Sequence, residues 1–322
     1  MGQTVSRLKD LISTNRIRVV CGENHAQAIL EHVPDLPSDQ VWVEPKPRNT
    51  APALALAAIL LKAQDPEAVM VVLPADHLIL AADWKKFSQD VQLAAQVAQT
   101  QDALVTFGIP PDHGATGFGY LEQGEKLKLA GGECFKVKAF HEKPDEDTAK
   151  AYWKSGNFLW NSGMFVWQVK TFLRELKDCQ PEAFALFQDL ASTIGSEDFS
   201  SRLVEVFNKV DSISVDYAVM EKASRVFMVP ASFSWDDVGS LTALGKVLSP
   251  DAKGNRSLGN FVALDAEDNL ILSKNKPVAI IGINDLLVVE TPDALLVLPK
   301  DRAQDVKEIV NKLKEQGRED LL

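Results

Sequence analysis

The sequence predicts an α/β fold with a mostly parallel sheet, followed by a small β-rich domain. Short apolar runs alternate with helical patterns over the first two-thirds of the 322 residues, as in sheets with helices on both faces. From about residue 249 the apolar runs are short and closely spaced, which is typical of a small all-β unit. We therefore expect two domains, residues 1–248 and residues 249–322.

Strands and helices are expected to alternate in the first domain. The run VMVVLP, residues 69–74, is continuously apolar, which indicates a strand covered on both faces. Asn49 or Thr50 can cap the helix that follows the strand VWVE, and Pro52 suits its first turn. Strands are expected at 17–22, 41–44, 69–74 and 103–108, and helices at 24–32, about 50–64 and 87–99.

The second domain is expected to start with a polar, turn-rich segment at residues 250–259. Short strands are then expected in the runs NFVALD, NLILS, VAIIG, LLVVE and ALLVLP. Residues 301–316 read as an amphipathic helix with four aliphatic residues on one face. These four residues are Val306, Ile309, Val310 and Leu313.

Composition excludes several classes of partner. The net charge of -11 disfavours nucleic acid and anionic membrane surfaces, because an acidic protein repels both. No apolar run approaches the length of a membrane span, and the first residues do not resemble a signal peptide. Cys21, Cys134 and Cys179 are widely spaced and form no metal-binding pattern, which favours reduced thiols in the cytoplasm.

Two acidic segments are candidates for binding a divalent cation. Asp76, in VLPADH, follows a buried strand, where a ligand loop begins, and its carboxylate suits a hard metal ion. In FSWDDVGS, Asp236 and Asp237 are adjacent, and only one of them should face the site if the backbone is extended. The alternative for both segments is helix or turn capping, with a helix at residues 240–247 after the second segment.

Three further segments suit recognition of a phosphorylated sugar. Glu142 and Lys143, in FHEKP, offer an acceptor for hydroxyl groups and a point charge for a phosphate. Gly119, in TGFGY, would let the backbone approach a ligand, and Asn161, in FLWNSGMFVW, could read sugar hydroxyls with its amide. The alternatives are an exposed ion pair, an ordinary turn and a turn amide without function.

The segment EPKPRNTAPALALAA could bind a nucleotide. Arg48 offers a planar guanidinium to a phosphate or a base, and the start of the following helix offers backbone amides to an anion. The alternative is a capped helix with no binding role.

The order of these motifs resembles the mannose-1-phosphate guanylyltransferases along nearly the whole chain. The series is EPKPRNTAPA, VLPADH, TGFGY, EKP, LWNSGMFVW, SVDYAVME, WDDVGS and TPDALLVLPKDRAQDVK. RNTAPA, WNSGMF and DYAVME are the specific elements, whereas the PADH, EKP and paired-glycine elements are shared with sugar nucleotidyltransferases generally. The closing PKDRAQDVK also resembles the guanylyltransferase tail. The resemblance implies a Rossmann-like, mixed, mostly parallel sheet and a small left-handed β-helix-like C-terminal part. It also implies the single-function form of the enzyme, because no cupin-type isomerase segment follows.

The resemblance implies a reaction and a set of roles. GTP and mannose 1-phosphate would give GDP-mannose and pyrophosphate, with Mg²⁺ as the cofactor and a homodimer compatible with the sequence. Asp76 and Asp237 would bind Mg²⁺. Mannose 1-phosphate would be held by Gly119, Glu142, Lys143 and Asn161, with Lys143 on the phosphate. The nucleotide would be held by Glu44, Arg48, Asn49 and Thr50.

One departure from the family pattern concerns its opening loop, of the form GGxGTRLxPxS, which this sequence does not contain. Roughly 30 residues, about one strand–loop–helix unit, have no counterpart. We therefore expect the 322 residues alone to have very weak transferase activity, either as a fragment or as a short form. Two alternatives remain: a nucleotidyltransferase for glucose 1-phosphate with UTP or dTTP, and a non-catalytic sugar-nucleotide sensor.

Overall fold

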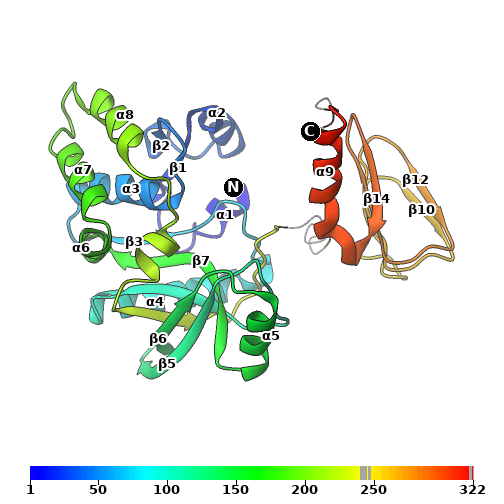
Figure 1. The fold of residues 1–322 in the computed structure, drawn as a ribbon, viewed down its shortest axis with the longest axis horizontal. Helices are drawn as coiled ribbons and strands as arrows, with labels where there is room; N and C mark the ends of the chain where they lie inside the picture. The colour runs from blue at the N-terminus through cyan, green and yellow to red at the C-terminus, as the bar shows by residue number, and fades with distance from the viewer. Residues whose placement is uncertain (240–244, 246–247, 319–320, 322) are drawn as a thin grey trace. The chain divides into compact units, whose positions relative to one another are not determined.

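The chain forms two compact units, Met1–Trp235 and Asp236–Leu322, in the computed structural model (Figure 1). The structure describes residues 1–239, 245, 248–318 and 321. Apart from residue 245, the helix predicted at 240–247 lies outside the described residues. The predicted division after residue 248 therefore stays a prediction, and each unit is described by itself.

A six-stranded mixed sheet lies at the centre of the first unit, in the order β3-β7-β4-β8-β6-β5. Only β4 and β8 pair in parallel, and the other neighbours are antiparallel, so β3, β4, β5 and β8 run one way and β6 and β7 the other. The predicted mixed sheet is confirmed, but the expectation that it is mostly parallel was wrong, because β4 and β8 are its only described parallel pair. The strands are β3 (Val69–Val72), β4 (Leu104–Ile109), β5 (Tyr120–Leu129), β6 (Gly132–His141), β7 (Phe158–Gln168) and β8 (Val226–Pro230).

The first two strands form a separate sheet. β1 (Val19–Gly22) and β2 (Val41–Glu44) pair in parallel with each other, and β3 is an edge strand of the larger sheet. The strand at residues 69–74, expected to be covered on both faces, is therefore shorter and mostly half-buried. An apolar run specifies burial of side chains, whereas the neighbours of a strand depend on pairing with distant segments.

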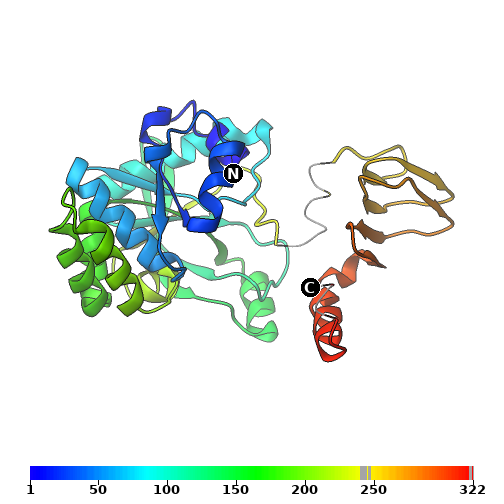
Figure 2. The ribbon, with the colours of Figure 1, turned by 90° about the horizontal axis from the view of Figure 1, so that it is seen from above.

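The side chains of β7 alternate between the two faces of the six-stranded sheet, so this strand contributes to both hydrophobic cores. Met164 and Val166 join one hydrophobic core, with α4 (Trp84–Thr100). Phe165 and Trp167 join the other, against four helices that lie side by side (Figure 2). These helices are α3 (Thr50–Gln64), α6 (Val169–Cys179), α7 (Pro181–Ala191) and α8 (Phe199–Lys209). Each large apolar side chain buried here stabilises the fold by about 1.5–3 kcal/mol.

The remaining helical segments of the first unit are shorter. They are α1 (Gly2–Ser6), α2 (Glu23–His32), α5 (Glu146–Ser155), the 3₁₀ turns η1 (Thr14–Arg16), η2 (Ser38–Gln40) and η3 (Ala81–Asp83), and the π-turn η4 (Asp216–Met220). Among the described helices of both units, none combines the length and the apolar character that a bilayer crossing requires.

Parallel strands that alternate between two sheets build the second unit, as in a β-helix. One sheet contains β9 (Arg256–Leu258), β11 (Leu270–Leu272), β13 (Leu286–Glu290) and the antiparallel β14 (Leu295–Pro299). The other contains β10 (Phe261–Leu264) and β12 (Val278–Ile281). The predicted β-helix-like part is confirmed, and the buried Asn269 side chain donates to Asn255 Oδ1 at 2.9 Å, which links two successive turns of chain.

Two expectations for this unit were wrong in detail. In the segment expected to be polar and turn-rich, residues 250–259, the strand β9 was not predicted; it is stabilised by pairing with β11. The helix predicted at 301–316 starts as a 3₁₀ segment, η6 (Lys300–Asp305), and becomes α-helical only in α9 (Val306–Glu315). Such 3₁₀ turns are frequent at helix starts, and the periodicity of the sequence does not distinguish them from α-helix.

Substitution of Gly259 by alanine should destabilise the second unit. Gly259 has a φ of +116°, and an added Cβ atom would overlap the carbonyl oxygen of Ser273. We expect Gly259→Ala to lower the unfolding free energy of this unit by about 2–3 kcal/mol. All six tryptophans lie at or before residue 235, so hydrogen exchange of peptides from residues 256–299 is the appropriate measurement.

The matched control for this substitution is Gly282→Ala. Gly282 also has a positive φ, +67°, but open space surrounds its added Cβ position. This variant should lose only about 1–2 kcal/mol, the cost of the backbone conformation alone. Equal losses for the two variants would contradict the predicted overlap.

Candidate active site

Gly119, Glu142 and Asn161 meet where β5, β6 and β7 come together. The backbone N–H of Asn161 donates to the Gly119 carbonyl oxygen at 2.8 Å, and Glu142 directly follows β6. A Cβ atom on Gly119 would overlap the Glu142 Oε2 atom, and it would lie 3.4 Å from the Asn161 Cβ. A side chain at position 119 would therefore displace the Glu142 carboxyl, and three of the residues predicted to bind the sugar lie in contact.

The Glu142 carboxyl is buried and only partly paired. Its Oε2 atom has no hydrogen-bond partner among the described residues, and its Oε1 atom lies 3.6 Å from Lys143 Nζ. Burial, followed by the nearby Asp216 carboxylate, raises the pKa of Glu142 to about 7. The unpartnered oxygen can therefore accept a hydrogen bond from a ligand hydroxyl, or donate one when it is protonated.

Lys143 reaches from this cluster toward solvent. Its side chain is 58% exposed, and its backbone adopts a φ of +48°, which costs a non-glycine residue about 1–2 kcal/mol. Strained residues of this kind concentrate at functional sites. The ammonium group is thus placed beside the Glu142 carboxyl but stays accessible to an anion.

A buried hydrogen-bond network fixes the Asn161 amide. Its Oδ1 atom accepts from Thr106 Oγ1 at 2.9 Å, and its Nδ2 atom donates to Asp216 Oδ1 at 2.9 Å. Burial raises the pKa of Asp216. The register of β7 against β4 shifts between Thr106 and Gly108, and such bulges often occur next to active sites. We did not predict Asp216 as a site residue, although it lies in the quoted motif SVDYAVME.

The loop that carries Asp76 lies beside this cluster. A Cβ atom on Gly163, two residues after Asn161, would be 3.8 Å from His77 Cε1 and 3.9 Å from Pro74 Cγ. The Asp76 side chain is exposed, and it forms no hydrogen bond or ion pair within the described residues. Its carboxylate oxygens are therefore available to a hard cation.

Asp237 belongs to the second unit, so its pairing with Asp76 stays a prediction. Asp237 Oδ1 accepts from the Gly239 amide at 3.0 Å, and Asp236 Oδ1 accepts from the Val238 amide at 2.8 Å. Both carboxylates thus stabilise the turn through one oxygen. Within the described residues, no three His, Cys, Asp or Glu side chains group closely enough to hold a metal.

On the predicted nucleotide side, Arg48 is used for a structural purpose. Its Nε and Nη2 atoms donate to the carbonyl oxygens of Phe207, at 2.7 Å, and Asn208, at 3.2 Å, near the end of α8. A cation at this end of a helix satisfies carbonyl groups that have no partner within the helix. The role predicted for Arg48, on a phosphate or base, stays a prediction.

The start of α3 has few free amides for an anion. The Thr50 amide donates to the side chain of Asn49, which caps the helix as predicted, and the Ala51 amide donates to the Ile213 carbonyl. Pro52 has no N–H group. The capping alternative for this segment therefore describes its local structure, and nucleotide contacts of Asn49 and Thr50 stay predictions.

Glu44 ends β2, beside Gly22 at the end of β1. Its Oε2 atom is buried and has no hydrogen-bond partner among the described residues, and burial raises its pKa. A pocket of about 510 Å³ is lined by β1, α2, Met1 and Ala75, the neighbour of Asp76. Glu44 and this pocket therefore lie at the carboxyl ends of parallel strands, where ligands bind in α/β sheets.

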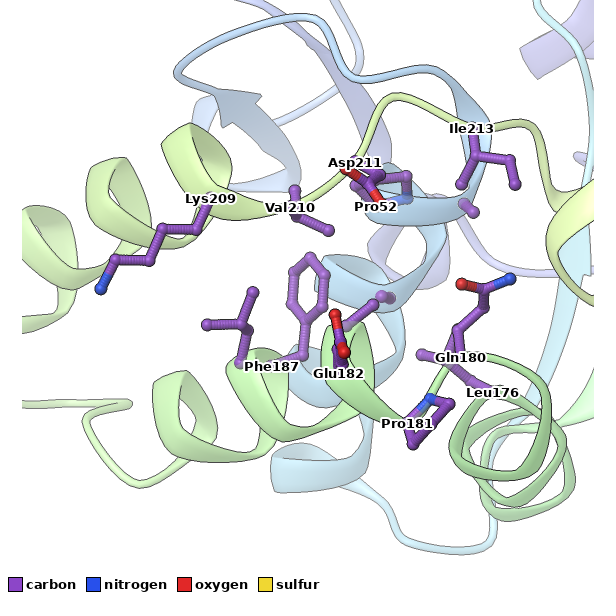
Figure 3. Close-up of a pocket in the computed structure, with 14 residues that line it drawn as sticks. Pro52, Leu176, Gln180, Pro181, Glu182, Phe187, Lys209, Val210, Asp211 and Ile213 are labelled. Atoms are coloured by element: carbon purple, nitrogen blue, oxygen red, sulfur yellow. The ribbon is translucent and has the colours of Figure 1, made fainter.

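A second pocket, of about 250 Å³, lies between α3, α7 and the end of α8 (Figure 3). Its lining includes Pro52, Phe187 and Val210, and none of the predicted site residues. We therefore do not assign it to the candidate active site.

Comparison with known proteins identifies the family. A model of the nucleotidyl transferase family matches residues 2–254. The chain belongs to this family. A model of the mannose-phosphate isomerase/GMP-like β-helix domain matches residues 259–313, in agreement with the second unit of this nucleotidyl transferase.

Several relatives are similar along nearly the whole chain. A mannose-1-phosphate guanylyltransferase of Salmonella typhimurium strain LT2, RfbM, is 39% identical over 98% of this chain and 65% of its own length. A mannose-1-phosphate guanylyltransferase of Escherichia coli K12 is 36% identical over 98% of this chain and 66% of its own length. This nucleotidyl transferase chain thus spans just under two-thirds of these two relatives.

A solved structure from Thermus thermophilus, described as a mannose-1-phosphate geranyltransferase, is also similar. It superposes with a TM-score of 0.84 at 30% identity, over 97% of this chain and 88% of its own. The nucleotidyl transferase fold with its additional β-helix-like unit is thus shared with an experimental structure.

The Glu142 carboxyl should make the stability of the first unit depend on pH. Its pKa is about 7 in the folded chain and 4.5 ordinarily, so the folded state retains a proton that the unfolded state loses between these values. This contribution is complete below pH 4.5 and is lost as the pH rises through 7. We expect Glu142→Gln to gain about 1–2 kcal/mol relative to the native chain between pH 5 and pH 8.

Urea unfolding followed by tryptophan fluorescence measures this effect, because all six tryptophans lie in the first unit. The expected result is a stability difference between the two proteins that grows with pH. A difference that stays constant from pH 5 to pH 8 would show that Glu142 is not buried as described.

Proposed function

We propose that this chain transfers the guanylyl group of GTP to mannose 1-phosphate, with release of pyrophosphate. The observation that carries the proposal is the contact of Gly119, Glu142 and Asn161 beside Lys143, which combines hydroxyl-binding groups with a cation for one phosphate. The relatives that carry the name mannose-1-phosphate guanylyltransferase support this substrate pair. The sugar phosphate would be held with its hydroxyls at Glu142 and Asn161 and its phosphate at Lys143.

In the reaction, a phosphate oxygen of mannose 1-phosphate attacks the α-phosphorus of GTP. A new P–O bond forms, the bond to the β-phosphate oxygen breaks, and pyrophosphate leaves in line. The protein contributes mainly by holding two anions close together and by stabilising charge on the non-bridging oxygens. Lys143 would position the attacking phosphate, and Glu142 would fix the sugar ring.

A divalent cation, Mg²⁺ in our proposal, fits the carboxylates of Asp76 and Asp237. Asp76 has no other partner within the described residues. Asp237 Oδ1 accepts a hydrogen bond from the Gly239 amide. When bound, the ion would neutralise charge on the reacting phosphates. Within the first unit, Trp235 donates to His77 Nδ1 at 3.1 Å, one residue from Asp76 in sequence.

Glu44 is the residue we propose for guanine recognition, with Arg48, Asn49 and Thr50 as further residues of the nucleotide side. A carboxylate can accept hydrogen bonds from the N1–H and 2-amino groups of guanine together, and Glu44 Oε2 lacks a partner among the described residues. A cytoplasmic location and assembly as a homodimer complete the proposal.

Turnover and binding test this function. Calorimetry should detect binding of mannose 1-phosphate, and pyrophosphate release should be fastest with GTP and mannose 1-phosphate among pairs that include UTP, dTTP and glucose 1-phosphate. The proposal would fail if mannose 1-phosphate did not bind, or if UTP with glucose 1-phosphate gave faster release.

Asp76→Asn and Lys143→Met should separate metal binding from phosphate binding. Asp76→Asn should lower the rate of pyrophosphate release about 100-fold or more and raise the Mg²⁺ concentration needed for half-maximal rate. Lys143→Met should weaken mannose 1-phosphate binding about tenfold or more, with the Mg²⁺ requirement unchanged. Lys128→Met, an exposed lysine on β5, is the control and should match the native chain. Equal rates for all four proteins would contradict the assignment.

Glu44→Gln should change nucleotide preference. The amide cannot accept from both donors of guanine as a carboxylate can, so the preference for GTP over ITP, which lacks the 2-amino group, should fall about tenfold. The measurement is the ratio of kcat/KM values for the two nucleotides. A ratio that is unchanged in the variant would remove Glu44 from the guanine site.

A further inference from the structure

Among the described residues, hydrogen bonds leave the side-chain amide of Asn161 with one free hydrogen-bonding group. A side-chain amide has two acceptor positions on oxygen and two N–H donors. Its Oδ1 atom accepts from Thr106 Oγ1 at 2.9 Å and from the Gly163 amide at 3.3 Å, and one N–H donates to Asp216 Oδ1. The remaining group is the second N–H of Nδ2. Asn161 can thus donate to a sugar hydroxyl but has no acceptor position to offer.

Asp216 and the Gly163 backbone together determine which way this amide points, because the Gly163 N–H donates to Oδ1 and Asp216 accepts from Nδ2. A carboxylate only accepts hydrogen bonds, so Asp216 requires the nitrogen of Asn161 on its side. Thr106 is fully buried, and its single hydroxyl proton can be shared between Asn161 Oδ1, at 2.9 Å, and the Met164 carbonyl, at 3.0 Å. Without Asp216, Asn161 Oδ1 would still accept from Thr106 and Gly163. The N–H that now donates to Asp216 would be left unpaired in a half-buried site.

The backbone that carries Asp216 is tied to the start of α3. Asp216 is the first residue of the π-turn η4, a conformation that is rare and frequent at functional sites. The preceding amide, of Val215, donates to Thr50 Oγ1 at 2.8 Å, and the Ala51 amide donates to the Ile213 carbonyl at 3.1 Å. The segments RNTAPA and SVDYAVME, far apart in sequence, therefore form one connected structure.

We propose that Asp216 is a positioning residue that makes Asn161 a dedicated hydrogen-bond donor to the sugar of the substrate. The inference rests on the proposed function, because it concerns how mannose 1-phosphate is held. Asp216 acts through its hydrogen bond with Asn161. The hydrogen bond from the Val215 amide to Thr50 Oγ1 holds the backbone just before Asp216 in place.

The test compares two substitutions of Asp216. Asp216→Leu keeps the branched shape and the number of side-chain heavy atoms but has no acceptor, so mannose 1-phosphate binding measured by calorimetry should weaken about tenfold or more. Asp216→Asn keeps a carbonyl oxygen that can accept from Asn161, so its affinity should stay within about threefold of the native chain. Asp211→Leu changes an exposed carboxylate five residues earlier, and it should bind like the native chain.

A double-mutant cycle shows whether Asp216 acts through Asn161. If it does, Asp216→Leu should add little to Asn161→Ala, and the double variant should bind within about twofold of Asn161→Ala alone. Independent, multiplicative losses would overturn the inference. Circular dichroism and tryptophan fluorescence check that each variant is folded, and Asp216→Ala replaces Asp216→Leu if the latter does not fold.

The outcomes separate this inference from the proposed function. If the native chain does not bind mannose 1-phosphate, the proposed function fails, and the inference fails with it. If the native chain binds but Asp216→Leu binds equally well, only the inference fails. If both Asp216→Leu and Asp216→Asn lose affinity equally, the charge of Asp216, and not its orientation of Asn161, is the cause, and the inference is again overturned.

Discussion

The strand β7 is the element on which the first unit depends, because both hydrophobic cores pack against it. Its alternating side chains, such as Val166 on one face and Trp167 on the other, join α4 to one side of the sheet and the helix group to the other. The first half of the same strand contains the polar residues Asn161 and Ser162. The rigid core therefore extends directly into the candidate site, and this continuity is what holds polar side chains at fixed positions.

Placing polar groups at the edge of this core is unfavourable unless they are paired. Asn161 is satisfied by Thr106 and Asp216, whereas Glu142 keeps one oxygen without a partner among the described residues. Such an oxygen remains buried only because the surrounding structure imposes its position. A ligand with a hydroxyl group would supply the missing hydrogen bond, which gives a physical reason for selective binding at this point.

The nucleotide side differs in how its predicted residues are used. Arg48, Asn49 and Thr50 all form hydrogen bonds within the chain, to α8, to the start of α3 and to the segment before Asp216. These hydrogen bonds connect helices. Any contact with GTP would be made by the donors and acceptors of these residues that the bonds do not use. Glu44 differs from them, because its buried oxygen lacks a partner within the described residues.

The sequence by itself determined the order of the elements, the α/β character of the first unit and the β-rich character of the second, because periodicity and turn chemistry are local properties. The mixed sheet and the β-helix-like form were implied by the family resemblance. The sequence also identified Gly119, Glu142 and Asn161, through motifs whose order resembles a known family. Only the tertiary structure decided that β1 and β2 form their own sheet, that Arg48 caps α8, and that Asp216 accepts a hydrogen bond from Asn161. These features depend on contacts between residues more than fifty positions apart or on strand neighbours, which no local pattern encodes.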